Sequence, residues 1–401
     1  MEYLGLLIKS ERLGQEISQE ALCHGICSTS YLSKIENANT VASEEIYDLL
    51  FKRLGITYYA EEEVSAVKFK IEQFYHNLLF RIKQDTSVLL EELEIYLYSP
   101  LYLFIEITKC YIKFQNKEES NYQKLKEFNT FFSTQENYYY TLLCSFYESD
   151  AIVAIKMLSP LLLDKNDGLV MEEIASRYYR FGEYSLAIQY GEKAFHQYSL
   201  QGNIESMADV VGLIANSYLN LENLTHAKQW FETLENLNNT IKSDNLRYSI
   251  QYNLGASYLV NQDYQQAEYH LEQAYKCILQ IEVSESTIFN TYQKLCLTKI
   301  ELNKQIEAKQ YLQEYLKTNS VPKDYQQDYE LLEYKVNQKE YYKEKKYLEL
   351  LEATYQMSKK RKHHGNLKYY AKELIEAYQQ NRMYKQAAEL ASEYAFPELK
   401  K

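Results

Sequence analysis

The sequence predicts an all-α protein that is built mainly from repeated helical hairpins. Glycine and proline are rare, with 11 and 4 among 401 residues, so tight turns and helix breakers are few. Apolar residues recur at helical spacing along nearly the whole chain. A pattern of small and large apolar residues also returns at a step of 40 residues. The first two observations favour helices, and the third favours a regular stack of them.

The clearest repeat lies between Gly212 and Ala274. A small residue, a tyrosine, an alanine and a large apolar residue occur there twice in the same order and spacing: Ala215, Tyr218, Ala227 and Phe231, then Gly255, Tyr258, Ala267 and Leu271. Further copies flank them: Ala175, Tyr178, Ala187 and Ala194 upstream, and Cys296, Ala308, Leu312 and Tyr315, then Ile375, Tyr378, Ala387 and Ala391 downstream. The order is similar to the tetratricopeptide repeat, in which small residues let two antiparallel helices approach.

Three regions are expected along the chain. Residues 1–57 predict a bundle of short helices, and residues 58–67, which include three consecutive glutamates, predict a charged linker helix. Residues 68–401 predict about eight to nine hairpins in a right-handed superhelix with a concave inner face. The hairpins are degenerate up to about residue 170 and regular beyond it.

Charge and composition narrow the function. A net charge of −12 gives the whole molecule no general affinity for nucleic acid. No apolar run approaches the ~20 residues of a membrane helix, and no secretory signal pattern opens the chain. Six scattered cysteines without a Cys-x-x-Cys pair are typical of reduced thiols, so we expect a cytoplasmic protein. Phosphate-binding glycine loops and metal-ligand spacings are missing, so we expect no enzyme, metal or cofactor.

Residues 3–57 contain the pattern of a helix-turn-helix. Ser18 has the side chain of an N-cap for a second helix, and Gly25 supplies a turn. A third helix from Ser28 to Glu36 begins with short polar side chains, and a fourth, apolar helix ends at Gly55. Short polar side chains at a helix N-terminus can closely approach base edges and phosphates, which favours DNA binding.

The segment from Leu4 to Ile56 resembles the Cro/repressor-type (XRE) DNA-binding domain. The resemblance rests on Ile8 with Arg12, on residues 17–22 and on residues 30–37. It implies a set of DNA-facing residues: Gln19, Ser28, Thr29, Ser30, Tyr31 and Lys34, with Arg12 at a phosphate and Asn37 and Asn39 beside the DNA backbone.

The charge of this first region argues against strong DNA binding by a single copy. Residues 1–57 carry five basic and eight acidic side chains, which gives a net charge of −3. Phosphate contacts dominate DNA affinity, so an acidic domain should bind weakly as a monomer. Two alternatives remain open. A dimer on a two-fold symmetric operator would compensate for the charge, or the bundle serves only as a protein contact.

The inner face of the superhelix predicts a groove for an extended peptide. In each hairpin the first helix lines this face, at fixed positions around the small residue. These positions hold Ser176, Tyr179, Arg180, Asn216, Leu219, Asn220, Tyr252, Asn253, Ala256, Leu259, Asn290 and Gln293. Amides satisfy peptide N–H and C=O groups, Arg pairs with a carboxylate, and apolar side chains form pockets. The alternative for each amide is a solvated helix residue.

A basic run lies near the end of the chain, with the sequence Lys359-Lys360-Arg361-Lys362-His363-His364. Such a run favours a solvated helix end. The alternative is a contact with an acidic partner or subunit.

A Cro-type domain joined to a tetratricopeptide superhelix resembles the RRNPP family of peptide-sensing regulators (Rap, Rgg, NprR, PlcR and PrgX), and most of all its NprR-like members. The resemblance implies a cytoplasmic, homodimeric quorum-sensing transcriptional regulator. Such a protein binds double-stranded DNA and is controlled by a short signalling oligopeptide in its groove. The alternative within the same family is a Rap-like module that binds a response regulator or kinase under peptide control.

Overall fold

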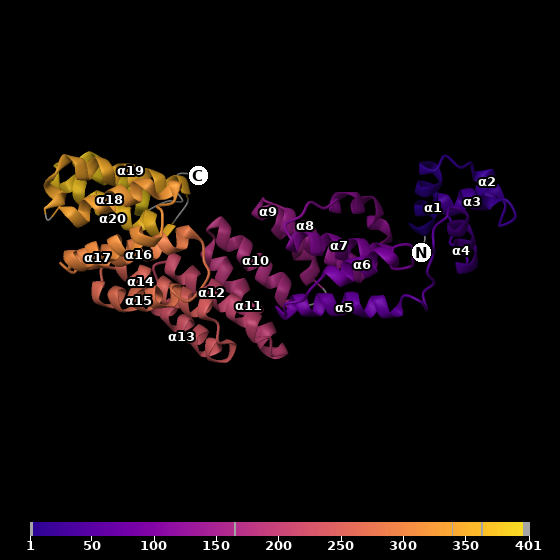
Figure 1. The fold of residues 1–401 in the computed structure, drawn as a ribbon, viewed down its shortest axis with the longest axis horizontal. Coiled ribbons are helices and arrows are strands. Elements are labelled where there is room, and N and C mark those ends of the chain that lie inside the picture. The colour runs from indigo at the N-terminus through magenta and orange to yellow at the C-terminus, as the bar shows by residue number, and fades with distance from the viewer. Residues whose placement is uncertain (1–2, 164–165, 339, 362–363, 396–401) are drawn as a thin grey trace. The chain divides into compact units, whose positions relative to one another are not determined.

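The protein is helical throughout the part that the computed structural model describes, which comprises residues 3–163, 166–338, 340–361 and 364–395 (Figure 1). Within these ranges there are α-helices and short 3-10 helices and no strands, so the predicted all-α class is confirmed. The chain divides into two compact units, Met1–Val210 and Val211–Lys401, and each is described by itself.

The first unit opens with a bundle of four short helices: α1 (Tyr3–Gly14), α2 (Gln19–Cys23), α3 (Thr29–Glu36) and α4 (Glu44–Arg53). The side chain of Ser18 accepts a hydrogen bond from the Ala21 amide at 3.1 Å and caps α2. Ser28 caps α3 in the same way through the Tyr31 amide, also at 3.1 Å. Gly25 has a φ of +72° between the two helices. The predicted cap at Ser18, the third helix and the glycine turn are therefore confirmed, and Ser28, expected as the first residue of that helix, is its cap.

Helices α1 and α3 pack closely enough to require a glycine. A Cβ atom at Gly5 would lie 1.9 Å from the carbonyl oxygen of Ile35, which is backbone and has no rotamer to change. The close approach brings Leu4, Ile8 and Ile35 into one core, in which each is fully buried.

The expected linker helix over 58–67 is wrong for most of its length. Residues 56–60 have no regular secondary structure, residues 61–64 form turns, and α5 (Ser65–Leu79) begins only at Ser65. The Tyr58 ring stacks on Phe51 of the bundle with a centroid distance of 5.4 Å, and the Tyr59 amide donates to the Tyr98 carbonyl at 3.0 Å. These aromatic and backbone contacts keep the start of the segment out of a helix, despite its run of helix-favouring glutamates.

The bundle is not an isolated domain, because it shares its core with the helices that follow. Leu103 is fully buried in that core, and Tyr98, Tyr102 and Phe128 pack against it. The Tyr3 hydroxyl donates to the Pro100 carbonyl. The first unit therefore contains both the bundle and the early hairpins. Its further helices are α6 (Ser87–Ile95), α7 (Tyr102–Gln115), η1 (Tyr122–Phe131), α8 (Thr134–Tyr147), α9 (Ala151–Leu158), η2 (Ser159–Leu162), α10 (Gly168–Phe181) and α11 (Tyr184–Gln201), and α12 (Ile204–Asn220) contains the boundary.

The second unit is a series of antiparallel hairpins. Its helices are α13 (Leu224–Ile241), α14 (Asp244–Val260), α15 (Tyr264–Ile278), α16 (Glu285–Glu301), α17 (Gln305–Thr318), η3 (Lys323–Tyr325), α18 (Gln326–Asn337), η4 (Tyr341–Lys343), α19 (Lys345–Arg361), α20 (His364–Gln380) and α21 (Tyr384–Ala395). The small-residue positions of the repeat are buried, for example Ala215, Ala227 and Ala267. At Gly255 a Cβ would lie 2.6 Å from the Leu271 side chain. The repeat pattern thus marks the helix contacts, as predicted.

Candidate functional site

The N-terminus of α3 presents most of the residues that the Cro-type resemblance assigns to DNA. Ser28, Thr29, Ser30 and Lys34 are exposed, and Tyr31 is half-buried beside them. The helix N-terminus carries a partial positive charge and free backbone N–H groups, both of which suit a phosphate. The surface is therefore small, polar and sterically open.

Asn37 and Asn39 follow directly after α3 and are also exposed. The Asn37 side chain donates to the Ser33 carbonyl and accepts from the Lys9 ammonium, each at 2.8 Å. This contact places a second basic residue, Lys9 of α1, at the end of α3. No local pattern could have predicted this contact, because Lys9 and Asn37 are 28 positions apart.

Arg12 does not project toward solvent as a phosphate ligand would. Its Nε and Nη2 donate to the two carboxylate oxygens of Glu36 at 2.6 and 2.9 Å, and Nη1 donates to the Ile17 carbonyl at 2.8 Å. Both charged residues are buried, and the hydrogen bond to Glu36 raises the pKa of Arg12. The guanidinium ties α1 to the end of α3, and this leaves it no free edge for DNA.

Gln19 is engaged in the same pair. Its side-chain amide donates to Glu36 at 2.7 Å, and the residue is half-buried. Gln19 and Arg12 thus share one buried carboxylate. Their role in this geometry is to hold the helix-turn-helix together.

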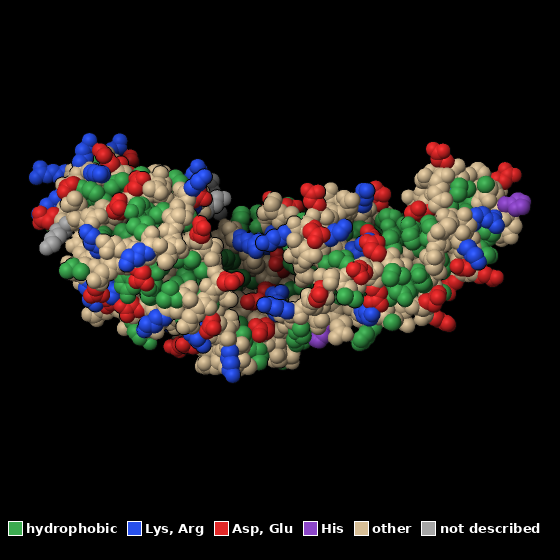
Figure 2. Space-filling model, in the orientation of Figure 1, with side chains coloured by type: hydrophobic (Ala, Val, Ile, Leu, Met, Phe, Trp, Pro, Cys, Tyr) green, Lys and Arg blue, Asp and Glu red, His purple; other side chains and the backbone are tan. Residues whose placement is uncertain are grey.

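The charged surface gives the bundle little general attraction for DNA. On the face drawn in Figure 2, acidic and basic side chains are interspersed, and no continuous basic area covers the visible side of the N-terminal helices. Binding would therefore depend on local contacts at α3.

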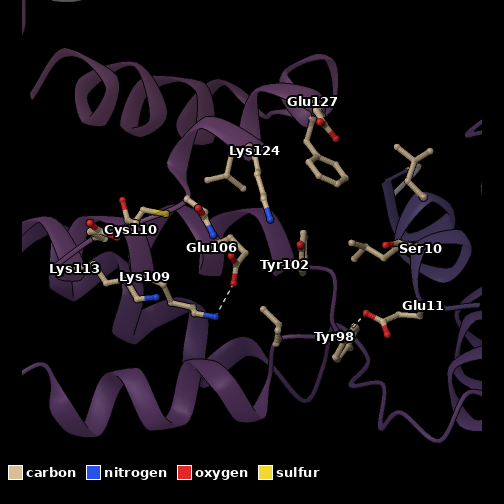
Figure 3. Close-up of a pocket in the computed structure, with 18 of the residues that line it drawn as sticks. Ser10, Glu11, Tyr98, Tyr102, Glu106, Lys109, Cys110, Lys113, Lys124 and Glu127 are labelled. Carbon is tan, nitrogen blue, oxygen red and sulfur yellow. Dashed lines mark hydrogen bonds and ion pairs between the residues drawn. The ribbon is translucent and has the colours of Figure 1, made fainter. Parts of the chain in front are cut away.

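A polar cleft of about 830 Å³ separates α1 from α7 and η1 within the first unit (Figure 3). The Tyr98 hydroxyl donates to Glu11 of α1 at 2.8 Å across it. Lys109 pairs with Glu106 at 2.7 Å, and Lys113 and Lys124 lie along the same cleft. The hydrogen bond across the cleft and the shared core beside it fix the orientation of the bundle on the first hairpins.

The residues predicted to line a peptide groove fall into two groups. Ser176, Tyr179 and Arg180 lie on α10 of the first unit, where Ser176 and Tyr179 are half-buried and Arg180 is exposed. The other nine lie in the second unit, and the site is built from these.

An accessible set lies on α12 and α14. Its members are only partly buried: Asn216, Leu219, Asn220, Tyr252, Asn253 and Ala256. They place amides beside apolar and aromatic surface, the combination that holds an extended peptide. Leu259 was expected to join them, but it is 1 % exposed and belongs to the core.

Asn290 and Gln293 of α16 do not line an open groove. They are only 8 % and 1 % exposed. Asn290 donates to the Tyr325 hydroxyl at 3.2 Å, and Gln293 donates to Asp328 at 3.1 Å and to the Tyr370 hydroxyl at 2.8 Å. Tyr370 belongs to α20, a helix far along the chain. The expected exposure of α16 fails because later helices cover it.

Helix α20 lies across the C-terminal ends of two earlier helices. The Lys368 ammonium donates to the Asn220 carbonyl of α12 at 2.9 Å, and the Lys372 ammonium donates to the Val260 carbonyl of α14 at 3.2 Å. Residues four apart share one helix face, so a single stripe of α20 caps both ends. Ammonium groups also favour the negative end of a helix dipole. Helix α20 therefore lies beside the partly exposed residues of α12 and α14.

Replacement of both lysines by methionine should loosen these helix ends. In the variant K368M/K372M, the last turns of α12 and α14 lose one cap each, and hydrogen exchange there should quicken by about fivefold, since each cap contributes about 1 kcal/mol. The control K385M removes an exposed lysine of α21 and should change nothing. Unchanged exchange at α12 and α14 would show that α20 is not a cap.

The basic run is only partly a solvated helix end. Lys360 is exposed, but Lys359 pairs with Glu393, and Arg361 pairs with the fully buried Asp328 at 2.5 Å. Lys362 and His363 lie outside the described residues. The solvated interpretation is therefore wrong for Arg361, whose partner is 33 positions away in sequence.

The fold defines a helical-repeat protein with a helix-turn-helix bundle at its N-terminus. No family model matches the chain. It is 23 % identical over 299 residues to the transcriptional activator NprA of Geobacillus stearothermophilus, which covers 69 % of this chain and 74 % of that protein. Among solved structures, the apo quorum sensor NprR from B. thuringiensis aligns with a TM-score of 0.61 at 19 % identity, over 82 % of this chain and 99 % of that one.

Apo RapI aligns with a TM-score of 0.62 at 15 % identity, over 82 % of this chain and 98 % of that one. NprR in complex with its cognate peptide NprX aligns at 0.52 and 19 % identity, over 81 % and 99 %. The chain thus has the fold of the RRNPP proteins NprR and Rap, and the resemblance predicted from its sequence is confirmed. By their names, NprA is a transcriptional activator, and NprR is a quorum sensor that binds a cognate peptide. No helix in the described part is long and apolar enough to cross a membrane.

Proposed function

We propose that this protein is a cytoplasmic transcriptional regulator whose DNA binding is controlled by a short signalling peptide. One observation carries the proposal: a single chain combines an open, polar recognition-helix surface at α3 with an accessible amide-lined face on α12 and α14. NprR, whose fold the chain shares, has been solved with a cognate peptide.

The DNA side of the proposal rests on α3. Ser30 and Lys34 would contact the major groove, with Ser28 and Thr29 at phosphates near the helix N-terminus. The net charge of −3 makes two copies on a symmetric site necessary for useful affinity. The functional protein would therefore be a homodimer on a two-fold symmetric operator.

The peptide side rests on differential affinity. A peptide that bridges α12, α14 and α20 binds best to one curvature of the hairpins, so it shifts the population toward that curvature. The bundle shares a core with α7, so a change in the hairpins of its own unit would reorient α3.

A second function is favoured by two observations. The fold matches RapI as well as it matches NprR, and the N-terminal bundle is acidic. The protein would then bind a response regulator or kinase under peptide control, with the bundle as a protein contact. Sequence-specific, salt-dependent DNA binding separates the two functions.

The test begins with selection of binding sites from random double-stranded DNA at low salt. We expect a two-fold symmetric consensus, and we expect the variant K34A to weaken binding to it at least tenfold, as loss of one base or phosphate contact does. The control K52A removes an equally exposed lysine from α4 and should weaken binding much less. Failure to enrich any sequence would contradict the DNA-binding function and favour the Rap-like one.

A further inference from the structure

A buried polar cluster in the second unit has hydrogen-bonding capacity that the described residues do not use. We call it the α16 cluster: Asn290, Gln293 and Lys294 of α16, Asp328 of α18 and Arg361 of α19. All except Arg361 are less than 9 % exposed, and the Arg361 side chain is 12 % exposed. Helix α20 covers it through Tyr370 and Asn366.

Two acceptors in the cluster have no donor among the described residues. Asn290 and Gln293 use their NH₂ groups on Tyr325, Asp328 and Tyr370, while their carbonyl oxygens Oδ1 and Oε1 are buried without a partner. A rotated Gln293 amide would turn its oxygen toward the carboxylate of Asp328, so rotation does not remove the deficit. A buried acceptor without a donor costs about 1–3 kcal/mol, so a ligand N–H would be stabilising here.

One cationic donor is also unused. Arg361 gives Nη2 to Asp328 at 2.5 Å and Nε to the Met357 carbonyl at 3.3 Å, and its guanidinium lies 4.2 Å from the centre of the Tyr325 ring. Nη1 is buried and has no acceptor in the part of the chain that is described. The arginine is therefore fixed in place with one edge still able to bind an oxygen.

The cluster holds two cations against one carboxylate. The acceptor of the Lys294 ammonium is the neutral side-chain oxygen of Asn366, at 2.5 Å. Burial lowers the pKa of Lys294 to about 8, with Asp328 opposing the shift. Lys335, equally buried, behaves differently: burial lowers its pKa, but Glu373 and Glu301 raise it further than burial lowers it. Those two glutamates are engaged by Lys335, so Asp328 is the carboxylate that faces both Arg361 and Lys294.

We propose that the α16 cluster binds the free C-terminal carboxylate of the signalling peptide. The carboxylate oxygens accept from Arg361 Nη1 and Lys294 Nζ, and the N–H of the peptide's last residue donates to Gln293 Oε1. A water molecule would satisfy one acceptor but leave the charge unbalanced. An aspartate or glutamate side chain would balance the charge, but its own backbone N–H lies three or four bonds from the carboxylate carbon. A chain terminus holds the two groups only two bonds apart, and this assignment rests on the proposed peptide-receptor function.

The test compares one hexapeptide positional-scanning library in two forms, with free C-terminal carboxylates and with C-terminal amides, by calorimetry on the full chain. We expect free acids to bind at least 30-fold more tightly, because the amide leaves a buried charge pair unmade. Equal binding of both forms would overturn this inference and leave the receptor function standing. If neither form binds, the result contradicts the proposed peptide-receptor function and also the inference that rests on it.

A variant tests whether the preference for free C-terminal carboxylates depends on the α16 cluster. K294M removes the ammonium but leaves Arg361 and Asp328 as a neutral pair, so we expect it to melt no earlier than the wild type. It should lose most of the preference for free acids, whereas K309M, which removes an exposed lysine of α17, should keep it. A full preference in a folded K294M would contradict the assignment. R361K gives a second folded variant, because the lysine still pairs with Asp328. It lacks the second guanidinium nitrogen, Nη1, so we expect it too to lose most of the preference for free acids.

Discussion

Replacement of Gly5 by alanine is expected to destabilise the N-terminal bundle by about 3 kcal/mol, because a methyl group forced into a packed contact displaces its neighbours. The built Cβ lies 1.9 Å from the Ile35 carbonyl oxygen and 2.6 Å from its carbon. Helix α1 must move away from α3 to admit it. Chemical denaturation, followed by circular dichroism and by hydrogen exchange in α1–α4, measures the loss.

Gly14, at the other end of the same helix, provides the matched control. A Cβ there meets nothing within 4 Å, and its φ is not positive. G14A should be neutral or slightly stabilising, because alanine favours the helix. Equal stability of G5A and G14A would show that α1 and α3 are not in this close contact.

The variant R12M should lose about 3–5 kcal/mol, because it leaves the fully buried Glu36 carboxylate without its cation. The double variant R12M/E36L replaces the pair with apolar side chains and should recover most of the loss. Urea unfolding of the wild type, both single variants and the double variant gives the coupling energy directly.

The same series separates a structural arginine from a phosphate ligand. If Arg12 acts only through Glu36, R12M/E36L should bind the selected DNA with an unchanged salt dependence. A salt slope reduced by about one would mean that Arg12 leaves Glu36 and neutralises a phosphate in the complex.

The features that sequence predicted well are local. Ser18 and Ser28 cap helices through hydrogen bonds to amides three positions away, and the repeat alanines face a partner helix within the same hairpin. Spacing rules describe such contacts directly. This is why the helix class, the hairpins and the polar start of α3 were predictable.

The features that sequence missed depend on residues far apart in the chain. The helix-turn-helix pattern placed Arg12 at a DNA phosphate, but in the fold it is buried in an ion pair with Glu36, 24 positions away. Asn290 and Gln293 occupy inward positions of their repeat, yet Asn290 meets Tyr325, 35 positions later, and Gln293 meets Tyr370 of α20, 77 positions later. Arg361 lies in a basic run that is typical of a solvated end, and only the fold brings Asp328 to it. No local sequence pattern predicts these long-range contacts.

In residues 58–67 the local pattern predicted a helix that contacts with distant residues prevent. The glutamates of this segment favour helix, but Tyr58 and Tyr59 find Phe51 and the Tyr98 carbonyl, and these contacts outweigh local propensity. The consequence reaches function, because a bundle fixed to the first hairpins can report their movement.

The central claim is that one chain couples peptide binding to DNA binding, and one measurement tests it most directly. The affinity for the selected operator is measured by fluorescence anisotropy with and without the tightest library peptide, for the wild type and for N216A. We predict that the peptide changes wild-type DNA affinity at least fivefold, the lower end of typical coupling between sites. In N216A the peptide should lose its effect, while DNA binding without peptide stays unchanged. Peptide binding that leaves DNA affinity unaltered in the wild type would contradict the account.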